Sequence, residues 1–315
     1  MNYDKETRPN GVSSRTAEVL TEAMPWIKNC TGKTIVIKYG GAAMVDAELR
    51  AAVMADIVLL KIIGVNPVIV HGGGKAITEA MEREQLDVRF VDGQRVTTDA
   101  AMEVVRTVLT GKVNQELVAA INVHGNLAVG ISGADAGTIV ASQADVRLGR
   151  VGKVERVNSQ LVEDLVASDF IPVLATVGID EAGGFYNVNA DVVAGHVAAA
   201  IGAHKVIFLT DVDGLYEDFS NKDSLVSRMT LAEAQELVAG GTLATGMIPK
   251  MRSCIYAMES GVHRAHIING TTPHALLLEL LTDKGIGTMI DQAKDAESLG
   301  PKPLGTFASR LAVNN

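Results

Sequence analysis

The chain has few cysteines, no excess of basic residues and no long uninterrupted apolar run. Among its 315 residues only Cys30 and Cys254 are cysteines, so neither a disulfide framework nor a cysteine-based zinc site is supported. The net charge is −9, so no basic excess favours nucleic acid. Lys61 and Glu279 interrupt the longest apolar runs, and the first ten residues lack the apolar centre of a signal peptide. We therefore expect a cytoplasmic protein that binds neither nucleic acid nor a membrane.

Several standard motifs are also missing. Gly32-Lys33-Thr34 has the ending of a Walker loop, but Ile27 occupies the position of its first glycine. Gly72 and Gly74 supply two glycines of the dinucleotide fingerprint, but Ile77 stands at the third position. No Gly-x-Ser-x-Gly elbow occurs, and the seven histidines lack the spacing of metal ligands. We therefore expect no metal held by the protein alone.

What the chain does have is a regular alternation of apolar strands and helical patterns. Strands are predicted at residues 34–38, 65–70, 128–132, 171–177, 205–209 and 264–268. Helices are predicted at residues 47–63, 76–84, 99–108, 114–123, 161–167, 190–201, 231–239 and 248–260. Continuously apolar strands separated by helices indicate a parallel sheet covered on both faces. Residues 143–157 are charged, β-branched and rich in turns, and predict a hairpin outside this sheet.

Two glycine-rich loops follow the first two predicted strands. His71-Gly72-Gly73-Gly74-Lys75 lies between a strand and a helix, and Lys38-Tyr39-Gly40-Gly41 ends the strand before it. Glycines at the start of a helix expose backbone N–H groups and the positive end of the helix dipole. Either loop alone could be a tight turn. Both together, one of them led by a lysine, predict a phosphate-handling site.

Other polar side chains lie at predicted loops and helix starts, and each has a plain structural alternative. Arg95 could clamp a carboxylate or lie at the surface. Asp191, in the first turn of a helix, could serve a site or only favour the helix dipole. Asp211 and Asp213 follow a strand, where nucleotides bind in open α/β sheets, but aspartates also form turns. Lys250 opens a helix, where the dipole disfavours a cation, so we expect it to serve an anion.

The two ends differ from the rest of the chain. Residues 14–29 carry Ala17, Leu20, Met24 and Ile27 at helical spacing, and Pro25 should kink this helix. Its apolar stripe either packs on its own domain or docks on another subunit. Residues 295–315 have no convincing periodicity, and we predict a mobile tail.

Taken together, the motifs resemble those of the amino acid kinase family. They occur in the family's order, between residues 31 and 290, and the loop at 93–97 and the stretch at 187–191 favour the branch that phosphorylates N-acetyl-L-glutamate. The motifs are Lys38-Tyr39-Gly40-Gly41, His71-Gly72-Gly73-Gly74, Gly93-Gln94-Arg95-Val96-Thr97, Asn187-Val188-Asn189-Ala190-Asp191, Thr210-Asp211-Val212-Asp213-Gly214 and Gly246-Met247-Ile248-Pro249-Lys250.

The resemblance implies an α/β fold, a three-layer αβα sandwich with a mainly parallel central sheet. It divides the chain into an oligomerisation arm (1–30), a substrate-binding N-terminal lobe (31–179), a nucleotide-binding C-terminal lobe (180–292) and a tail (293–315). The implied reaction transfers a phosphoryl group from ATP, accompanied by Mg²⁺, to the side-chain carboxylate of N-acetyl-L-glutamate. This is the second step of arginine biosynthesis.

The resemblance also implies roles for individual residues. Those implied in catalysis are Lys38, Lys250 and Asp191. Those implied in substrate binding are Gly40, Gly41, Gly73, Gly74, Arg95 and Asn187. Those implied in nucleotide binding are Asp211, Val212, Asp213, Gly214, Leu215, Tyr216, Thr242, Leu243 and Ala244.

The two ends resemble the arginine-inhibited members of the family. The kinked helix before the first strand implies a homohexamer, a trimer of dimers joined by interlaced helices. The C-terminal pattern implies that L-arginine binds as an inhibitor near that helix, with His274, Glu279, Gly285 and Gly287 as candidate contacts.

Three other functions stay open on the residues alone. Another member of the family is the first, although Arg95 and Asn187 disfavour it. A non-catalytic amino-acid sensor is the second, and the joint presence of Lys38, Asp191 and Lys250 argues against it. A nicotinamide oxidoreductase is the third, weakened by the missing glycine at position 77.

Overall fold

The computed structural model of the chain describes residues 11–44, 46–218, 220–241 and 243–292. Its centre is an eight-stranded sheet in the order β12-β14-β13-β11-β1-β2-β8-β5. All neighbours in this sheet are parallel except β13 and β14. The strands are β1 (Thr34–Tyr39), β2 (Asn66–His71), β5 (Ala128–Ser132), β8 (Ile171–Ala175), β11 (Lys205–Thr210), β12 (Arg228–Thr230), β13 (Arg264–Asn269) and β14 (Thr288–Asp291).

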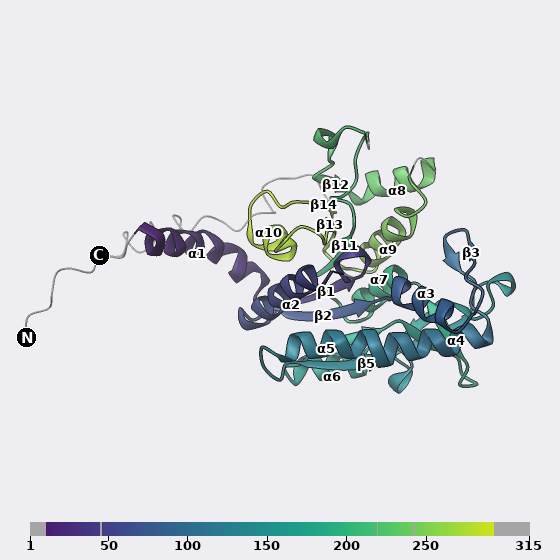
Figure 1. Cartoon of the computed structure of the whole chain (residues 1–315). Coiled ribbons are helices and arrows are strands. Elements are labelled where there is room, and N and C mark those ends of the chain that lie inside the picture. Colours follow the sequence, from purple (N-terminus) through teal and green to yellow (C-terminus); the bar gives the residue numbers. More distant parts are fainter. Residues whose placement is uncertain (1–10, 45, 219, 242, 293–315) are drawn as a thin grey trace, which may run out of the picture.

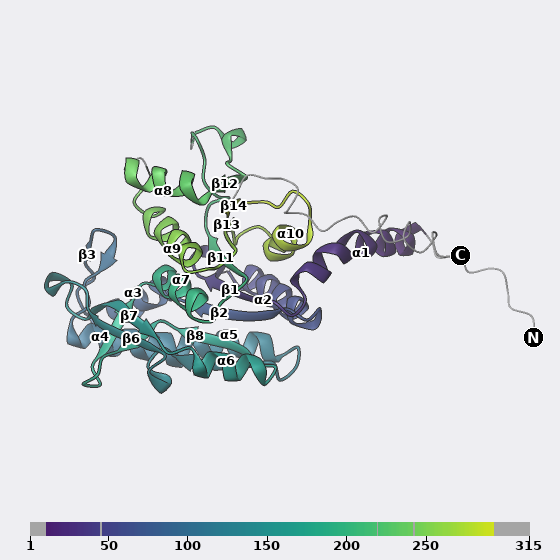
Figure 2. The same ribbon diagram turned by 180° about the vertical axis from the view of Figure 1, so that it is seen from behind.

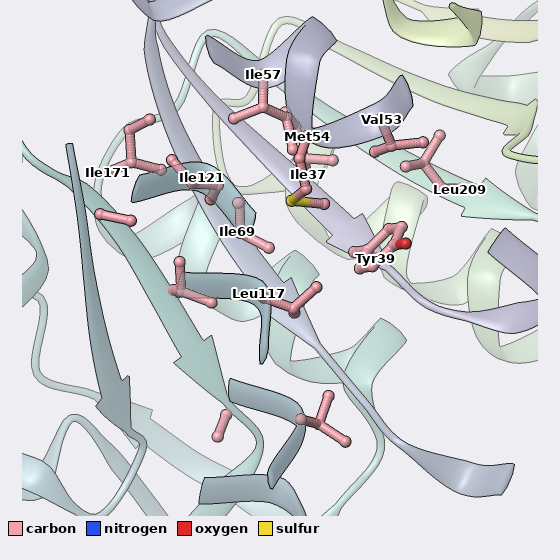
Figure 3. Close-up of a cluster of buried hydrophobic side chains, with 14 of the residues drawn as sticks. Ile37, Tyr39, Val53, Met54, Ile57, Ile69, Leu117, Ile121, Ile171 and Leu209 are labelled. Atoms are coloured by element: carbon pink, nitrogen blue, oxygen red, sulfur yellow. The ribbon is translucent and has the colours of Figure 1, made fainter. Parts of the chain in front are cut away.

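Helices cover both faces of the sheet (Figures 1 and 2). Alternate side chains of β1 go to opposite faces, Ile35 and Ile37 to one cluster and Val36 to the other. The first cluster, part of which Figure 3 shows, joins the sheet to α2, α3, α4, α5 and α10, and the second joins it to α6, α7, α8 and α9. The predicted three-layer αβα sandwich is therefore confirmed.

The helix bounds agree closely with the periodicity of the sequence. The helices are α1 (Gly11–Cys30), α2 (Ala47–Ile62), α3 (Gly74–Arg83), α4 (Asp99–Arg106), α5 (Asn114–Asn122), α6 (Gln160–Ala167), α7 (Ala190–Ala200), α8 (Leu231–Gly240), α9 (Ile248–Glu259) and α10 (Ala275–Leu281). A π-helical segment, Thr107–Val113, links α4 to α5. No helix in the described part of the chain is both long and apolar enough to cross a membrane.

A small closed barrel stands beside the main sheet. It consists of β6 (Ile139–Gln143), β7 (Val151–Val157), β9 (Val177–Ile179) and β10 (Phe185–Val188). The hairpin predicted for residues 143–157 belongs to it, since β6 and β7 pair antiparallel. The single strand predicted for residues 171–177 is wrong, because β8 ends at Ala175 and the chain then enters the barrel as β9.

Helix α1 projects from the body of the molecule and bends on its way to β1 (Figures 1 and 2). Pro25 lies within it, as the predicted kink requires. Val19, Leu20 and Met24 leave about half or more of their surface exposed, at 56%, 60% and 49%. This apolar stripe therefore has no cover within the described part of the chain. The predicted tail, residues 293–315, lies outside the described residues.

Candidate active site

The carboxyl ends of the central parallel strands open into a cleft of about 900 Å³. Both glycine-rich loops lie here, because β1 and β2 are neighbours in parallel register, with Tyr39 opposite His71. The predicted site residues that line the cleft are Lys38, Gly40, Gly41, Gly73, Gly74, Arg95, Asn187, Asp191 and Asp211. Residues from five separate motifs thus meet at one edge of the sheet.

Two glycines of the cleft, Gly41 and Gly73, lie too close to neighbouring side chains to carry a side chain of their own. Gly41 has a φ of +75°, and a side chain there would collide with the Asp211 carboxylate. A Cβ on Gly73 would lie 2.8 Å from Cδ2 of Leu109, in the π-helical segment. Both positions therefore require glycine, one for its backbone conformation and the other for close packing.

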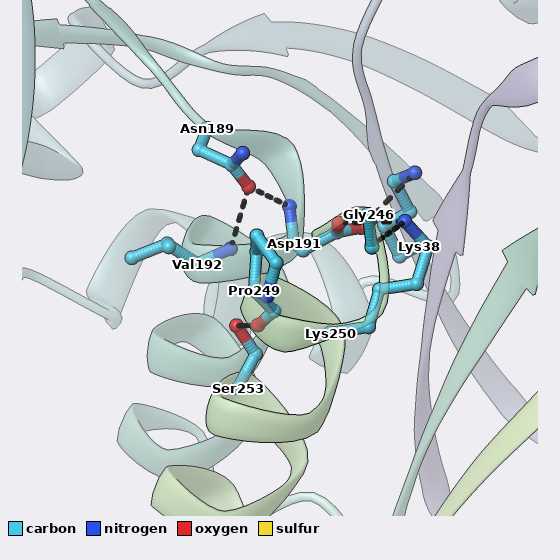
Figure 4. Close-up of polar contacts among 8 residues, drawn as sticks. All are labelled: Lys38, Asn189, Asp191, Val192, Gly246, Pro249, Lys250 and Ser253. Atoms are coloured by element: carbon cyan, nitrogen blue, oxygen red, sulfur yellow. Dashed lines mark hydrogen bonds and ion pairs between the residues drawn. The ribbon is translucent and has the colours of Figure 1, made fainter. Parts of the chain in front are cut away.

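The centre of the site is a carboxylate held between two lysines (Figure 4). Asp191 Oδ1 lies 3.0 Å from Lys38 Nζ, and Asp191 Oδ2 lies 3.2 Å from Lys250 Nζ. The three side chains come from α7, β1 and α9, and each is largely buried. Asn189 is the N-cap of α7, since its side chain accepts hydrogen bonds from the Asp191 and Val192 N–H groups. The cap sets the start of the helix and so the position of Asp191.

The electrostatics of this group favour its charged form. Burial alone would raise the pKa of the Asp191 carboxyl, but the Lys38 and Lys250 ammonium groups hold that pKa below its usual value. Two ammonium groups against one carboxylate leave a net positive charge at the cleft. An anion entering beside them would be stabilised by that charge.

Arg95 also lines the cleft, and it is buried. Its Nη2 donates to the Gly74 carbonyl at 2.9 Å and to Thr78 Oγ1 at 2.7 Å, and its guanidinium lies 4.7 Å from the centroid of the Phe90 ring. Burial lowers the pKa of Arg95. No carboxylate among the described residues forms an ion pair with it. A buried guanidinium on a cleft wall is well suited to an anionic ligand group.

Two details of this wall differ from the sequence prediction. Arg95 lies on β4 (Gln94–Arg95), which pairs with β3 (Phe90–Val91), and not in a turn. Asn187 lies on β10 and donates to Thr97 Oγ1 at 3.2 Å, while Thr97 donates to the Arg95 carbonyl at 3.0 Å. This chain of hydrogen bonds joins the two predicted substrate residues.

The predicted nucleotide residues do not all reach the cleft. Asp211 lines it, whereas Val212, Asp213, Gly214, Leu215, Tyr216, Leu243 and Ala244 are outside its lining. Thr242 lies outside the described residues. Asp213 accepts hydrogen bonds from the Tyr216 hydroxyl and, at 2.8 Å, from Asn269, and so braces the loop after β11. These contacts agree with the alternative that Asp213 stabilises a turn. A contact between Asp213 and the nucleotide stays a prediction.

The predicted arginine contacts gather around α10, which packs near α1. Glu279 Oε2 accepts from the Ile286 and Gly287 N–H groups at 2.7 and 3.1 Å, and a side chain on Gly285 would collide with this carboxylate. Glu279 Oε1 lies 2.6 Å from Nδ1 of His266. Three of the four predicted residues thus share one network, and His274 stands apart.

His274 pairs instead with a buried aspartate of α2. Its Nδ1 lies 2.7 Å from Asp56 Oδ1. Burial raises the pKa of Asp56, which also accepts from backbone N–H groups of Leu276 and Leu277 at the start of α10. Asp56 therefore caps α10 from another helix, and His274 belongs to that cap.

The structure adds residues that the sequence did not single out. Asn114, only 2% exposed, donates from Nδ2 to Nε2 of His71 at 3.0 Å and to the Val173 carbonyl at 2.7 Å. Lys75 and Lys112 line the mouth of the cleft. Lys75 follows the triple glycine and could have been found there, but Asn114 lies within a helical pattern and gives no such signal.

No group of three or more histidine, cysteine, aspartate or glutamate side chains in the described residues could hold a metal ion. Of the two aspartates at the cleft, Asp191 is already shared by two lysines. The donor set therefore fits a divalent ion that arrives bound to a ligand and is held by that ligand and by water.

Comparison with known proteins agrees with this geometry. The sequence profile of the amino acid kinase family matches residues 33–269. The chain therefore belongs to the amino acid kinase family, a family of phosphotransferases.

Two curated relatives are each named acetylglutamate kinase. The protein from Halothermothrix orenii is 50% identical over 279 residues, which covers 87% of this chain and 96% of the relative. The protein from Caldanaerobacter subterraneus is 50% identical over 277 residues, which covers 87% of this chain and 92% of the relative.

Among solved structures, the chain is similar to the N-acetylglutamate synthase from Neisseria gonorrhoeae complexed with coenzyme A and N-acetyl-glutamate. The TM-score is 0.77 at 24% identity, covering 89% of this chain and 64% of that one. At this identity the likeness supports the fold alone.

Proposed function

We propose that this chain transfers the γ-phosphoryl group of MgATP to the side-chain carboxylate of N-acetyl-L-glutamate. The products are N-acetyl-L-glutamyl 5-phosphate and ADP, and the reaction is the second step of arginine biosynthesis, carried out in the cytoplasm. The observation that carries the proposal is the cleft itself. Its lining includes a carboxylate shared by two lysines, and a buried arginine that has no acidic partner among the described residues. The 50% identical acetylglutamate kinases support the choice of substrate.

The attacking carboxylate is already charged, so the reaction needs no general base. The obstacle is repulsion between that carboxylate and the phosphoryl group, and catalysis is then a matter of positioning and charge neutralisation. Lys38 approaches the transferring group from β1 and Lys250 approaches it from α9. Asp191 pairs with both lysines and so fixes the distance between them. N–H groups of Gly40, Gly41, Gly73 and Gly74 stabilise the charge that develops on the phosphoryl oxygens.

The two lobes divide the substrates between them. In the N-terminal lobe, residues 31–179, Arg95 binds the α-carboxylate of N-acetyl-L-glutamate. Asn187, on β10 just past the boundary between the lobes, contacts the same substrate. In the C-terminal lobe, residues 180–292, segments 211–216 and 242–244 line the ATP site. Mg²⁺ arrives with ATP and is held mainly by phosphate oxygens and water.

The experiment that tests this function is a coupled ADP-release assay with and without N-acetyl-L-glutamate. ADP release should depend on that substrate, and hydroxylamine should trap the acyl phosphate as a hydroxamate. L-aspartate, carbamate and uridine monophosphate, tested in parallel, should be poor acceptors. ADP release that follows one of these instead would move the chain to another branch of the family.

We further propose that L-arginine inhibits the enzyme by binding near α10, beside α1. Burial lowers the pKa of His266, which favours its neutral form, and its Nε2 has no hydrogen-bond partner in the part of the chain that the structure describes. Lys205, also buried, forms no ion pair among the described residues. Lys205 and Glu279 would thus offer a positive and a negative charge to the carboxylate and the cationic groups of arginine.

The exposed stripe on α1 supports a homohexamer, a trimer of dimers joined through this arm. Val19, Leu20 and Met24 would be covered by another subunit's copy. Arginine would then act by shifting the ring between two states for which its affinity differs.

Deleting residues 1–28 should leave a catalytically active dimer that is less sensitive to arginine. The reason is that the truncation removes the apolar stripe and one wall of the inhibitor site together. Light scattering gives the mass of the particle, and an arginine titration of the ADP-release rate gives the sensitivity.

Two point variants serve as matched controls for the deletion. Leu20→Asp, in the stripe, should reproduce the loss of the hexamer, and Glu22→Gln, outside it, should not. A truncated protein that stays hexameric with unaltered inhibition would show that α1 packs only on its own domain.

A further inference from the structure

The segment that opens the triple-glycine loop contains a histidine that the proposed mechanism does not use. His71 is the last residue of β2, and its side chain has no solvent exposure. Its Nδ1 lies 2.9 Å from the carbonyl oxygen of Gly72, and its Nε2 lies 3.0 Å from Nδ2 of Asn114. The ring therefore bridges the glycine loop and the start of α5.

These neighbours determine which ring nitrogen carries the proton. A carbonyl oxygen can only accept, so Nδ1 must donate to Gly72. The amide nitrogen of Asn114 can only donate, and its contact with the Val173 carbonyl at 2.7 Å fixes the orientation of this amide. Nε2 of His71 is then the acceptor, and the ring is neutral. Burial lowers the pKa of His71 to about 4, which agrees with a neutral ring at physiological pH.

The Gly72 carbonyl shares its peptide plane with the N–H group of Gly73. Because the peptide is planar and trans, a hydrogen bond that fixes the carbonyl direction also fixes the opposite direction of that N–H. Gly73 lines the cleft, and its N–H has no acceptor among the described residues. It is one of the groups that would face the transferring phosphoryl.

The same helical region holds the loop by a second contact. Leu109 and Val113, of the π-helical segment, lie so close to Gly73 that a Cβ there would be 2.8 and 3.3 Å from their side chains. Asn114 follows directly and reaches His71. A π-helical insertion at such a place is typical of functional sites, because it redirects side chains within a continuous helix.

We infer that His71 is a positioning residue, whose neutral Nδ1–H tautomer, set by Asn114, orients the Gly73 N–H toward the phosphoryl group in transfer. The inference rests on the proposed function, because it assigns Gly73 to the transferring group. Its direct consequence is that kcat depends on the donor at Nδ1, and that the contact of Asn114 with Nε2 matters for kcat only because it keeps the proton on Nδ1.

Two substitutions at position 71 separate these roles. In His71→Asn, the side-chain amide places a donor near the position of Nδ1. In His71→Gln, the amide reaches the position of Nε2, and the carbonyl oxygen of Gly72 is left without a donor. His71→Gln should lower kcat by about 10-fold to 100-fold, less than the removal of an oxyanion donor, with the KM values for ATP and N-acetyl-L-glutamate little changed. His71→Asn should keep most of the turnover. Because the ring is neutral, neither variant should shift the pH profile of kcat above pH 6.

Helix α5 offers a second pair in case the variants at position 71 fold poorly. Asn114→Ala should lower kcat because His71 loses the partner that sets its tautomer. Asn122→Ala should lose its hydrogen bonds to Leu127 and Ala128 at the other end of α5, with kcat retained. Equal losses of kcat in His71→Gln and His71→Asn, or equal losses in the two asparagine variants, would overturn the inference. A wild-type protein inactive on N-acetyl-L-glutamate would instead defeat the proposed function.

Discussion

Replacing Lys250 with alanine should lower kcat by about 10²–10³-fold, with little change in the KM for N-acetyl-L-glutamate. The Lys250 ammonium group lies 3.2 Å from the Asp191 carboxylate, and Lys250 itself is outside the cleft lining that includes Arg95, so we do not expect it to hold the body of the amino acid. Its charge is needed most while the phosphoryl group passes between two anions. Loss of an interaction made chiefly in the transition state lowers kcat and kcat/KM together.

A matched control separates this effect from damage to the fold. Lys61 is also a buried lysine in an ion pair, 2.6 Å from Asp169, but it lies on α2, and its partner is outside the cleft lining, whereas Asp191 lines the cleft. Lys61→Ala should therefore cost stability without a comparable fall in kcat. Steady-state kinetics and thermal unfolding of both variants provide the comparison. If Lys250→Ala turns over at nearly the wild-type rate, Lys250 is not part of the catalytic group.

Local sequence was enough to predict most of the fold. Strands such as β1 and β2 are continuous apolar runs bounded by glycine, and helices such as α7 begin at a strong cap, Asn189. These signals lie within a few residues of each element. Elements such as β12, β14 and α10 were not predicted. The strand predicted at 171–177 was wrong, because the chain leaves the main sheet after Ala175. An apolar run does not reveal that the chain changes sheets within it.

The candidate site was predictable where topology brings motifs together. Lys38 lies near the carboxyl end of β1 and the triple glycine follows β2. These strands are parallel neighbours, so the meeting of the two motifs at one edge follows from the fold. Asn114, by contrast, contacts His71 from 43 residues away, and it directly follows a π-helical segment that the periodicity of α4 and α5 conceals. Asp56 likewise caps α10 from the middle of α2. Contacts of this kind depend on tertiary packing, which a single sequence does not display.

Replacing Arg95 with alanine should raise the KM for N-acetyl-L-glutamate by about 10-fold to 100-fold. A charge-assisted hydrogen bond to a carboxylate is worth about 1.5–3 kcal/mol, and within the described ranges this guanidinium has no acidic partner of its own. Arg95→Lys should restore only part of the affinity, because the two-pronged donor geometry is lost. Initial rates over a range of substrate concentrations measure the effect.

Arg106 is a suitable control, since its guanidinium lies 4.6 Å from the centroid of the Phe185 ring, much as Arg95 lies over Phe90, but it is outside the cleft lining. Arg106→Ala should leave the KM close to that of the wild type. A second comparison uses 4-acetamidobutyrate, which keeps the reacting carboxylate but lacks the α-carboxylate. The wild-type enzyme should use it poorly, and Arg95→Ala should add little further loss, because both changes remove the same interaction. A full additional loss with this analogue would mean that Arg95 serves the loop through Gly74 and Thr78 and does not bind the α-carboxylate.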